Sequence, residues 1–232
     1  MEQRAVGVVI VAGGSGSRMG GAIPKQFALI DGEPILARTI NNFARAFAGA
    51  TIIVVLPASQ IEFWKNYSAR FRVARHKIVE GGEQRFHSVK NGIEAICGFV
   101  DLIAVQDGVR PFTSQQMILE AAECAAEHGS AIPVIDAVDS FRQITDSGNQ
   151  IVDRSKLRVV QTPQIFDASL LRAAYDTDYQ PIFTDDASVV EFTTPHRVTL
   201  CRGEKTNIKI TTPEDMIFAQ AIAQAIKDEQ QE

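Results

Sequence analysis

The feature that most constrains the fold is a short apolar run, Val8–Ala12, followed at once by a glycine-rich loop. The run is rich in β-branched side chains and ends at glycines, a pattern typical of a strand that is buried on both faces of a sheet. Gly13, Gly14 and Gly16 carry no Cβ, so the loop backbone can adopt positive φ and bring its N–H groups close to a ligand. The sequence therefore predicts a strand that ends in an anion-binding loop.

The charges around the loop indicate which anion it binds. The whole chain carries a net charge of −5. Between Glu2 and Asp31, however, there is no carboxylate, whereas Arg18 and Lys25 both lie in this interval. This local excess of positive charge favours a phosphate ligand that is held from two sides. The competing interpretation is an ordinary βα turn with a solvated arginine, and the density of glycines makes it the weaker one.

Spacing excludes two well-known phosphate loops. A dinucleotide-binding Gly-x-Gly-x-x-Gly pattern that begins at Gly14 needs a third glycine where Met19 stands. A Walker loop ends in Gly-Lys followed by Ser or Thr, and Ser17-Arg18-Met19 does not match that ending. The remaining interpretation is a triphosphate loop with one arginine inside it and one lysine beyond it.

Strand and helix patterns alternate along the first part of the chain. Four further apolar runs predict buried strands, namely Thr51–Leu56, His76–Glu80, Leu102–Gln106 and Ala131–Ile135. Helical spacing of apolar residues fills the intervals, and Ser114 is a suitable N-cap for a helix over Gln115–His128. This alternation predicts an α/β fold, a Rossmann-like, mostly parallel sheet with helices on both faces. With 232 residues, we expect a single domain over 1–232.

The pattern changes after the predicted strand Ala131–Ile135. Residues 138–160 have no helical period, and two short segments, 141–144 and 151–152, flank the turn-rich segment 145–150. This arrangement is typical of a β-hairpin. Because an isolated hairpin is only marginally stable in water, we expect this arm to lie against another surface.

Composition and termini exclude several classes of protein. No stretch has the roughly 18 consecutive apolar residues of a membrane span, and the first residues show no signal-peptide pattern, so we expect a cytoplasmic protein. The cysteines lie far apart, without neighbours at metal-ligand spacing, as plain thiols in a reducing compartment do. The negative net charge argues against binding to nucleic acid.

Two further turns carry polar residues after predicted strands. Asp107 directly follows Leu102–Gln106, and a carboxylate at a strand tip beside a phosphate loop is placed to bind Mg²⁺ or another divalent cation. Helix capping is the alternative role for Asp107, but Ser114 lies nearer to the next helix. The segment Gly81–Ser88 follows the predicted strand His76–Glu80, and a helix is expected to begin near Glu83. This start would place open N–H groups at the ligand-binding edge of the sheet. Arg85 in this segment could equally be a surface residue.

These motifs resemble those of a known family. Ala-Gly-Gly-x-Gly-x-Arg-Met at residues 12–19, followed by Pro-Lys-Gln at 24–26, is similar to the signature of nucleotidyltransferases that join a nucleoside triphosphate to a sugar phosphate. Over nearly all 232 residues the chain resembles the 2-C-methyl-D-erythritol 4-phosphate cytidylyltransferases of the non-mevalonate isoprenoid pathway. The resemblance implies transfer of CMP from CTP to that polyol phosphate, giving 4-diphosphocytidyl-2-C-methyl-D-erythritol and pyrophosphate.

The resemblance also implies roles for individual residues. Asp107 is the implied metal ligand, and the implied catalytic cations are Arg18, Lys25, Arg154 and Lys209. The implied substrate contacts are Ala12, Gly13, Gly14, Gly16, Gly82, Glu83, Ser88, Asp107, Arg110, Ser140, Thr162 and Thr184. Among these, the Gly-Gly-x-x-Arg-x-x-Ser segment at 81–88 is expected to face the cytosine base. Thr184 or its neighbour Asp185 also suits the N-cap of a helix.

In the resembled family the arm crosses to a second subunit. This implies a homodimer through residues 138–160, with Ser140 and Arg154 entering the active site of the partner. The chain departs from the family pattern at two places. Gln106 stands where the family has a histidine before the metal-binding aspartate. Thr206 stands where some members carry an acid, so a second metal carboxylate is not expected there.

Two other functions stay open. Ribitol 5-phosphate cytidylyltransferases share the glycine loop and the Pro-Lys-Gln-Phe segment, although Val152-Asp153-Arg154 in the arm, upstream of Thr162-Pro163-Gln164, favours the erythritol phosphate. A nucleotide-binding protein that has lost turnover is the second alternative. The presence of Arg18, Lys25 and Asp107 argues against it.

Overall fold

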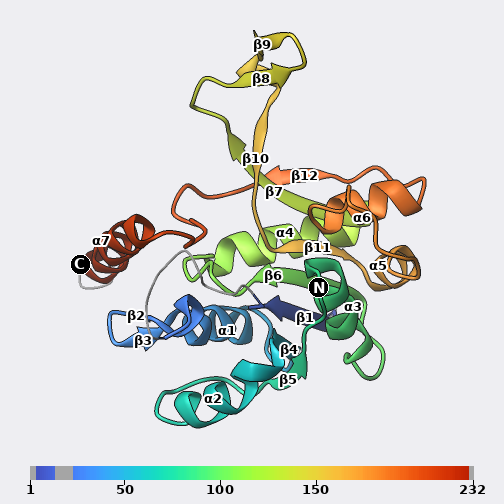
Figure 1. The fold of residues 1–232 in the computed structure, drawn as a ribbon. Coiled ribbons are helices and arrows are strands. Elements are labelled where there is room, and N and C mark those ends of the chain that lie inside the picture. Colours follow the sequence, from blue (N-terminus) through green and yellow to red (C-terminus); the bar gives the residue numbers. More distant parts are fainter. Residues whose placement is uncertain (1–3, 14–22, 230–232) are drawn as a thin grey trace.

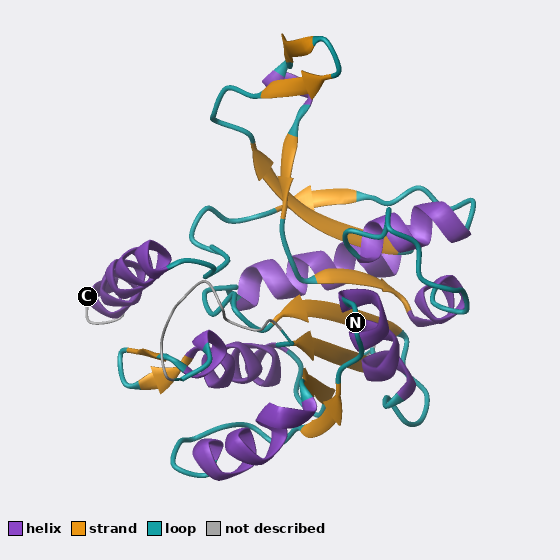
Figure 2. Cartoon of the chain, in the orientation of Figure 1, coloured by secondary structure: helices purple, strands orange, loops and turns teal. Residues whose placement is uncertain are grey.

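The computed structural model describes residues 4–13 and 23–229 of the chain, and its centre is one large twisted sheet (Figures 1 and 2). The strands of this sheet are β1 (Val6–Val11), β4 (Thr51–Leu56), β5 (Lys77–Glu80), β6 (Leu102–Asp107), β7 (Ser130–Asp136), β10 (Arg158–Val160), β11 (Gln164–Asp167) and β12 (Leu200–Arg202). Their order is β10-β7-β11-β6-β1-β4-β5, and β12 pairs with β7.

Most pairings in the sheet are parallel. β1 lies between β4 and β6 and runs parallel to both, and β5 and β12 also run parallel to their neighbours. The predicted mostly parallel α/β sheet is therefore confirmed. The exceptions are β10 and β11, which run antiparallel to their neighbours. β11 was not among the strands predicted from the sequence, because its four residues contain only two apolar side chains in a row and no alternation.

Helices cover both faces of the sheet, as predicted. On one face lie α1 (Ile35–Ala46), α2 (Ala58–Ser68) and α4 (Gln115–His128), and on the other lie α3 (Arg85–Glu94), α5 (Ala168–Ala174) and α6 (Asp186–Thr193). The terminal helix α7 (Pro213–Glu229) packs beside the small hairpin of β2 (Leu29–Ile30) and β3 (Glu33–Pro34). Within the part of the chain that the structure describes, no helix is both long and apolar enough to cross a membrane.

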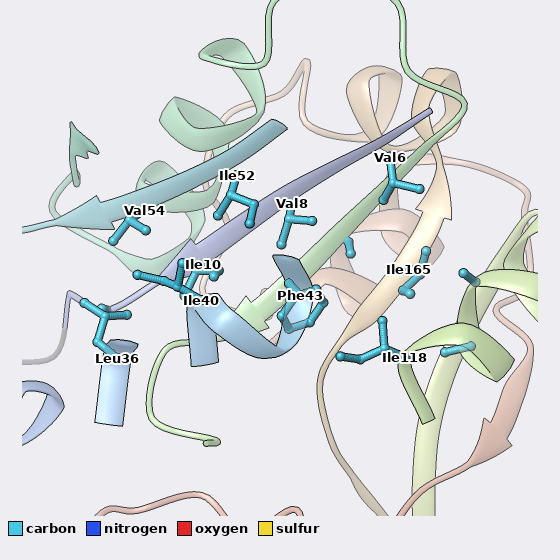
Figure 3. Close-up of a cluster of buried hydrophobic side chains, with 14 of the residues drawn as sticks. Val6, Val8, Ile10, Leu36, Ile40, Phe43, Ile52, Val54, Ile118 and Ile165 are labelled. Carbon is cyan, nitrogen blue, oxygen red and sulfur yellow. The ribbon is translucent and has the colours of Figure 1, made fainter. Parts of the chain in front are cut away.

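Side-chain alternation along the strands builds the two core layers. In β1, Val8 and Ile10 point to the layer of α1, where they meet Ile40 and Phe43 (Figure 3), whereas Val9 points to the layer of α3. All five side chains are fully buried. A strand that serves two cores has to be apolar at successive positions, which explains the uninterrupted apolar run from which the fold was predicted.

Helix caps set the boundaries around the site. α4 begins after Ser114, whose Oγ accepts a hydrogen bond from the Met117 N–H at 3.0 Å, as the sequence predicted. α3 begins at Arg85, two residues after Glu83, near which its start was predicted. The backbone of its N-cap Gln84 is still extended, and the Gln84 N–H donates to Nδ1 of His87 at 3.3 Å. Gly82 and Glu83 therefore lie in the loop between β5 and α3.

The arm is a β-hairpin that stands out from the body of the molecule (Figure 1). It consists of β8 (Arg142–Thr145) and β9 (Gly148–Ile151), which pair in antiparallel fashion from Arg142 opposite Ile151 to Thr145 opposite Gly148. The predicted hairpin is confirmed, but its strands extend further into residues 145–150 than expected, since a two-residue turn suffices to reverse the chain. The side chains of Ile144 and Ile151 are 80% and 82% exposed.

We predict that Phe43→Ala lowers the free energy of unfolding by about 3–5 kcal/mol, because truncating a fully buried ring leaves a cavity in the layer of α1. Phe99→Ala is the matched control, since the Phe99 side chain is 83% exposed, and we expect a change within about 0.5 kcal/mol. Urea unfolding followed by circular dichroism, at one protein concentration, measures both. Equal effects of the two substitutions would contradict the core described here.

Candidate active site

The predicted site residues gather where the parallel strands end. β1, β5 and β6 run in the same direction, so their carboxyl ends open to one edge of the sheet. Gly13 follows β1, Gly82 follows β5, and Asp107 is the last residue of β6. The turns are tied together, since the Gly108 N–H donates to the Val11 carbonyl at 2.8 Å. A side chain at position 108 would have its Cβ 2.8 Å from that of Ala12, so this approach requires glycine.

The loop after β5 presents the residues expected at the base. The Gly82 N–H donates to Oγ of Ser88, on the first turn of α3, at 3.1 Å. A Cβ at position 82 would lie 2.3 Å from the Cβ of His87, which explains the glycine. Glu83 is exposed beside them. Gly82 and Ser88 thus lie together, as the predicted grouping requires.

Asp107 is the electrostatic centre of the site. It is only 6% exposed. Its Oδ2 lies 3.0 Å from Nζ of Lys209 and 3.3 Å from Nε of Arg110, and its Oδ1 lies 3.8 Å from Nε of Arg85. Burial by itself would raise the pKa of the Asp107 carboxyl, but Arg85, Lys209 and Arg110 together hold that pKa below its ordinary value. The carboxylate is therefore ionised at neutral pH.

The partners of Asp107 are held in place by other buried groups. Nη1 of Arg110 donates to the backbone carbonyl of Asn207 at 2.8 Å, two residues before Lys209. The Asp107 N–H donates to Oγ1 of Thr162 at 3.1 Å. One cluster thus contains four residues predicted from the sequence, namely Asp107, Arg110, Thr162 and Lys209. Asp107 and Lys209 lie more than 100 positions apart in the sequence.

Arg85 had no definite role predicted from the sequence. Its guanidinium makes a bidentate pair with Asp186, with Nη1 to Oδ1 at 3.0 Å and Nη2 to Oδ2 at 2.7 Å. Asp186 is fully buried and also accepts a hydrogen bond from the Tyr175 hydroxyl at 2.6 Å. The pKa of Tyr175 is raised by burial and by Asp186. Arg85 therefore joins the α6 segment to Asp107. No pattern in the sequence reveals this link, because Arg85 and Asp186 are 101 residues apart.

Other predicted residues lie nearby or on the arm. Lys25 opens a short 3₁₀ turn, Lys25–Phe27, and the next residue, Gln26, donates from Nε2 to the Ala12 carbonyl at 3.0 Å, which ties this turn to the end of β1. Thr184 is exposed and precedes Asp185, which is the N-cap of α6, so the capping alternative applies to Asp185 and not to Thr184.

Some predicted residues are not brought to this cluster within one chain. Ser140 and Arg154 lie on the arm, which extends away from the sheet (Figure 1), and Nη1 of Arg154 donates to the Val138 carbonyl at 2.5 Å. Gly14, Gly16 and Arg18 lie outside the described residues.

The neighbourhood of Asp107 restricts how a metal could bind. Among the described residues there is no group of three or more His, Cys, Asp or Glu side chains that could hold a metal ion. A site built on Asp107 therefore suits a cation that takes most of its ligands from phosphate oxygens and water, as Mg²⁺ does.

Comparison with known proteins decides the family. The family profile described as 2-C-methyl-D-erythritol 4-phosphate cytidylyltransferase matches residues 6–225. The chain belongs to this family. The match spans every strand of the central sheet, the arm and most of α7, so it covers nearly all of the described fold and confirms the resemblance found in the sequence.

Individual relatives agree with the family assignment. A 2-C-methyl-D-erythritol 4-phosphate cytidylyltransferase from Phocaeicola vulgatus is 47% identical over 216 residues, covering 93% of this chain and 98% of the relative. Among solved structures, the 4-diphosphocytidyl-2C-methyl-D-erythritol synthase of Anaerococcus prevotii superposes with a TM-score of 0.81 at 28% identity, covering 96% of this chain and 97% of its own. The cytidylyltransferase of Thermus thermophilus gives a TM-score of 0.74 at 30% identity, covering 95% and 99%.

We predict that Arg85→Met lowers the free energy of unfolding by about 3–5 kcal/mol at neutral pH, because it leaves the fully buried Asp186 carboxylate without its counter-ion. The double variant Arg85→Met with Asp186→Leu removes both charges and should recover much of this loss. Urea unfolding of the wild type, both single variants and the double variant measures the coupling between them. Additive losses in the double variant would rule out the proposed pairing energy.

Proposed function

We propose that this member of the family transfers CMP from CTP to 2-C-methyl-D-erythritol 4-phosphate, releasing pyrophosphate and 4-diphosphocytidyl-2-C-methyl-D-erythritol for isoprenoid biosynthesis. The observation that carries the proposal is the buried, ionised Asp107, faced by Arg85, Arg110 and Lys209 at the edge of the sheet where the glycine turn of β1 begins. A 47% identical relative of nearly equal length bears the name of this activity.

The chemistry needs no general base. The nucleophile is a phosphate monoester, whose second pKa near 6 leaves it anionic at neutral pH. One of its oxygens forms a bond to the α-phosphorus of CTP, while the bond from that phosphorus to the bridging oxygen of the β-phosphate breaks and pyrophosphate leaves with the electron pair. The obstacle is therefore electrostatic, since two anions have to meet and negative charge grows on the leaving group.

Cations around the site are proposed to offset this repulsion. In the proposal, Lys25 and Arg18 hold the triphosphate from the side of the β1 turn, with the backbone of Ala12, Gly13, Gly14 and Gly16. Lys209 neutralises charge where the two phosphates meet. Preorganised cations of this kind stabilise a transition state by several kcal/mol because they need no reorientation during the reaction. The base is assigned to Gly82, Glu83 and Ser88, next to the end of β5.

Asp107 is the proposed ligand of the divalent cation, together with phosphate oxygens. When bound, Mg²⁺ or another divalent cation neutralises negative charge on those oxygens. Arg110 and Thr162 keep the Asp107 carboxylate and backbone in position, through the contacts at 3.3 Å and 3.1 Å. Thr184, exposed at the start of the α6 turn, is assigned to the polyol phosphate.

The arm is proposed to complete the site of a second copy of the chain. Its isoleucines Ile144 and Ile151 are almost fully exposed, as expected for a hairpin that packs on a partner. Arg154 and Ser140 lie on the same arm and are exposed. In a two-fold symmetric dimer each arm would carry these residues to the partner's Asp107 cluster.

The cytoplasmic location expected from the sequence stays a prediction.

A purified-protein assay of pyrophosphate release tests the substrate assignment. We expect release only when CTP and 2-C-methyl-D-erythritol 4-phosphate are both present with Mg²⁺, and loss of release in Lys209→Met. Ribitol 5-phosphate in place of the erythritol phosphate, and UTP in place of CTP, are the matched substrate controls. A preference for ribitol phosphate would replace the proposed substrate, and CTP binding without turnover on either polyol would favour a nucleotide-binding protein.

Subunit complementation tests the arm. Arg154→Ala removes the arm's cation and Lys209→Met damages the site, so each homodimer should be nearly inactive. After mixing under conditions of subunit exchange, about a quarter of wild-type activity should return, because half of the dimers are mixed and one of their two sites is intact. Sedimentation of the wild type should give a dimer. If both residues act within one chain, the mixture gains no activity.

A further inference from the structure

A ring of buried hydrogen bonds runs from Gln106 back to Asp107, and the peptide bond between these two residues completes it. Gln106 is fully buried at the end of β6, directly before Asp107. Its Nε2 lies 3.0 Å from Oγ1 of Thr113 and 3.3 Å from the carbonyl oxygen of Arg110. The two N–H groups of the amide thus have two separate acceptors on the turn that follows the strand.

The ring continues through two other segments of the chain. Oγ1 of Thr113 donates to Oδ1 of Asn207 at 2.9 Å, and Nδ2 of Asn207 donates to the carbonyl of Thr162 at 2.9 Å. Thr162 closes the ring, because its Oγ1 accepts the Asp107 N–H at 3.1 Å. Thr113, Asn207 and Thr162 are all at most 5% exposed. Water therefore offers these groups little competition for their partners.

The ring fixes two of the cations that face Asp107. The Arg110 carbonyl accepts from Gln106, and the Arg110 guanidinium donates to the Asn207 carbonyl at 2.8 Å, so Arg110 is held at both ends. Asn207 lies two residues before Lys209, whose Nζ is 3.0 Å from Oδ2 of Asp107. A shift in Asn207 would therefore move Lys209 as well.

The donors of Gln106 explain why an amide stands at this position. Oε1 of Gln106 is buried and has no hydrogen-bond partner within the described residues. A buried acceptor without a partner is unfavourable, so the amide is not explained by its oxygen. Its N–H groups, by contrast, both have acceptors. A neutral histidine, the residue of the resembled family at this position, offers only one N–H donor.

We infer that Gln106 is a positioning residue for the reaction proposed above, acting through Arg110 and Asn207. Its two donors hold the turn after β6, and this turn sets how Arg110 and Lys209 meet the Asp107 carboxylate. The inference rests on the proposed function of Asp107 as the metal ligand. Groups that orient a metal ligand in this way commonly affect metal affinity or activity by about 10- to 100-fold.

The test compares Gln106→Met, which keeps the length of the side chain but removes both donors, with Gln106→His, which keeps one. Binding of Mn²⁺ in the presence of CTP is measured by electron paramagnetic resonance, alongside kcat, the KM for CTP and the melting temperature. We expect Gln106→Met to lower Mn²⁺ affinity and kcat by about 10-fold or more with little change in the KM for CTP, and Gln106→His to lie between it and the wild type.

Ser130→Ala is the matched control, because Ser130 is fully buried and hydrogen-bonded to His196 at 2.8 Å, outside the Asp107 cluster. It should lower the melting temperature without changing Mn²⁺ affinity. Unchanged Mn²⁺ affinity in Gln106→Met would overturn the inference, as would losses that merely follow the melting temperature as in Ser130→Ala. If Gln106→Met does not fold, Gln106→His decides, and wild-type affinity in that variant overturns the two-donor argument.

Failure of the proposed function has a different signature. If the wild type releases no pyrophosphate with any polyol phosphate, the function fails, but the Mn²⁺ comparison still decides the positioning role. Asp107→Asn provides the reference for a lost metal ligand. Equal Mn²⁺ affinity in Asp107→Asn and the wild type would overturn both the metal assignment and the inference that depends on it.

Discussion

The structure depends on one costly feature, an ionised carboxylate buried at the tip of a central strand. Transfer of an unpaired carboxylate out of water costs several kcal/mol, so Asp107 requires compensating charge. The chain supplies that charge from three separate segments, through Arg85, Arg110 and Lys209. Neutralising Asp107 therefore brings α3, the turn after β6 and the segment before α7 together, which organises the edge of the sheet where the substrates are proposed to bind.

The same cations have a second use in the proposed reaction. A triphosphate and a divalent cation that enter this edge meet side chains already held in position, so little rearrangement is needed as charge develops. Arg85 is shared between Asp107 and the fully buried Asp186, and Asp186 begins α6. The nucleotide side and the α6 side of the site are thus coupled through one guanidinium. The same cations therefore offset the burial of Asp107 and, in the proposed reaction, bind phosphate.

The sheet topology determines which groups can join this cluster. Parallel pairing of β1, β4, β5 and β6 brings their following turns to one edge. The antiparallel strand β11 lies beside β6 and begins at that same edge, with Gln164 opposite Val105. This places Thr162, just before β11, against the backbone of Asp107. A parallel strand in that position would begin at the other edge and could not supply this contact.

The sequence by itself determined the α/β class, most strand positions and the hairpin arm, and it predicted Asp107, Arg110 and Lys209 as site residues. These depend on local patterns, such as apolar runs, glycines after strands and matched motifs, which act over a few residues. Only the tertiary structure decided the place of β11, the pairing of Arg85 with Asp186 and the hydrogen-bond ring of Gln106. Each of these joins groups that are far apart along the chain. The partner of a buried polar side chain depends on which groups folding brings next to it and shields from water.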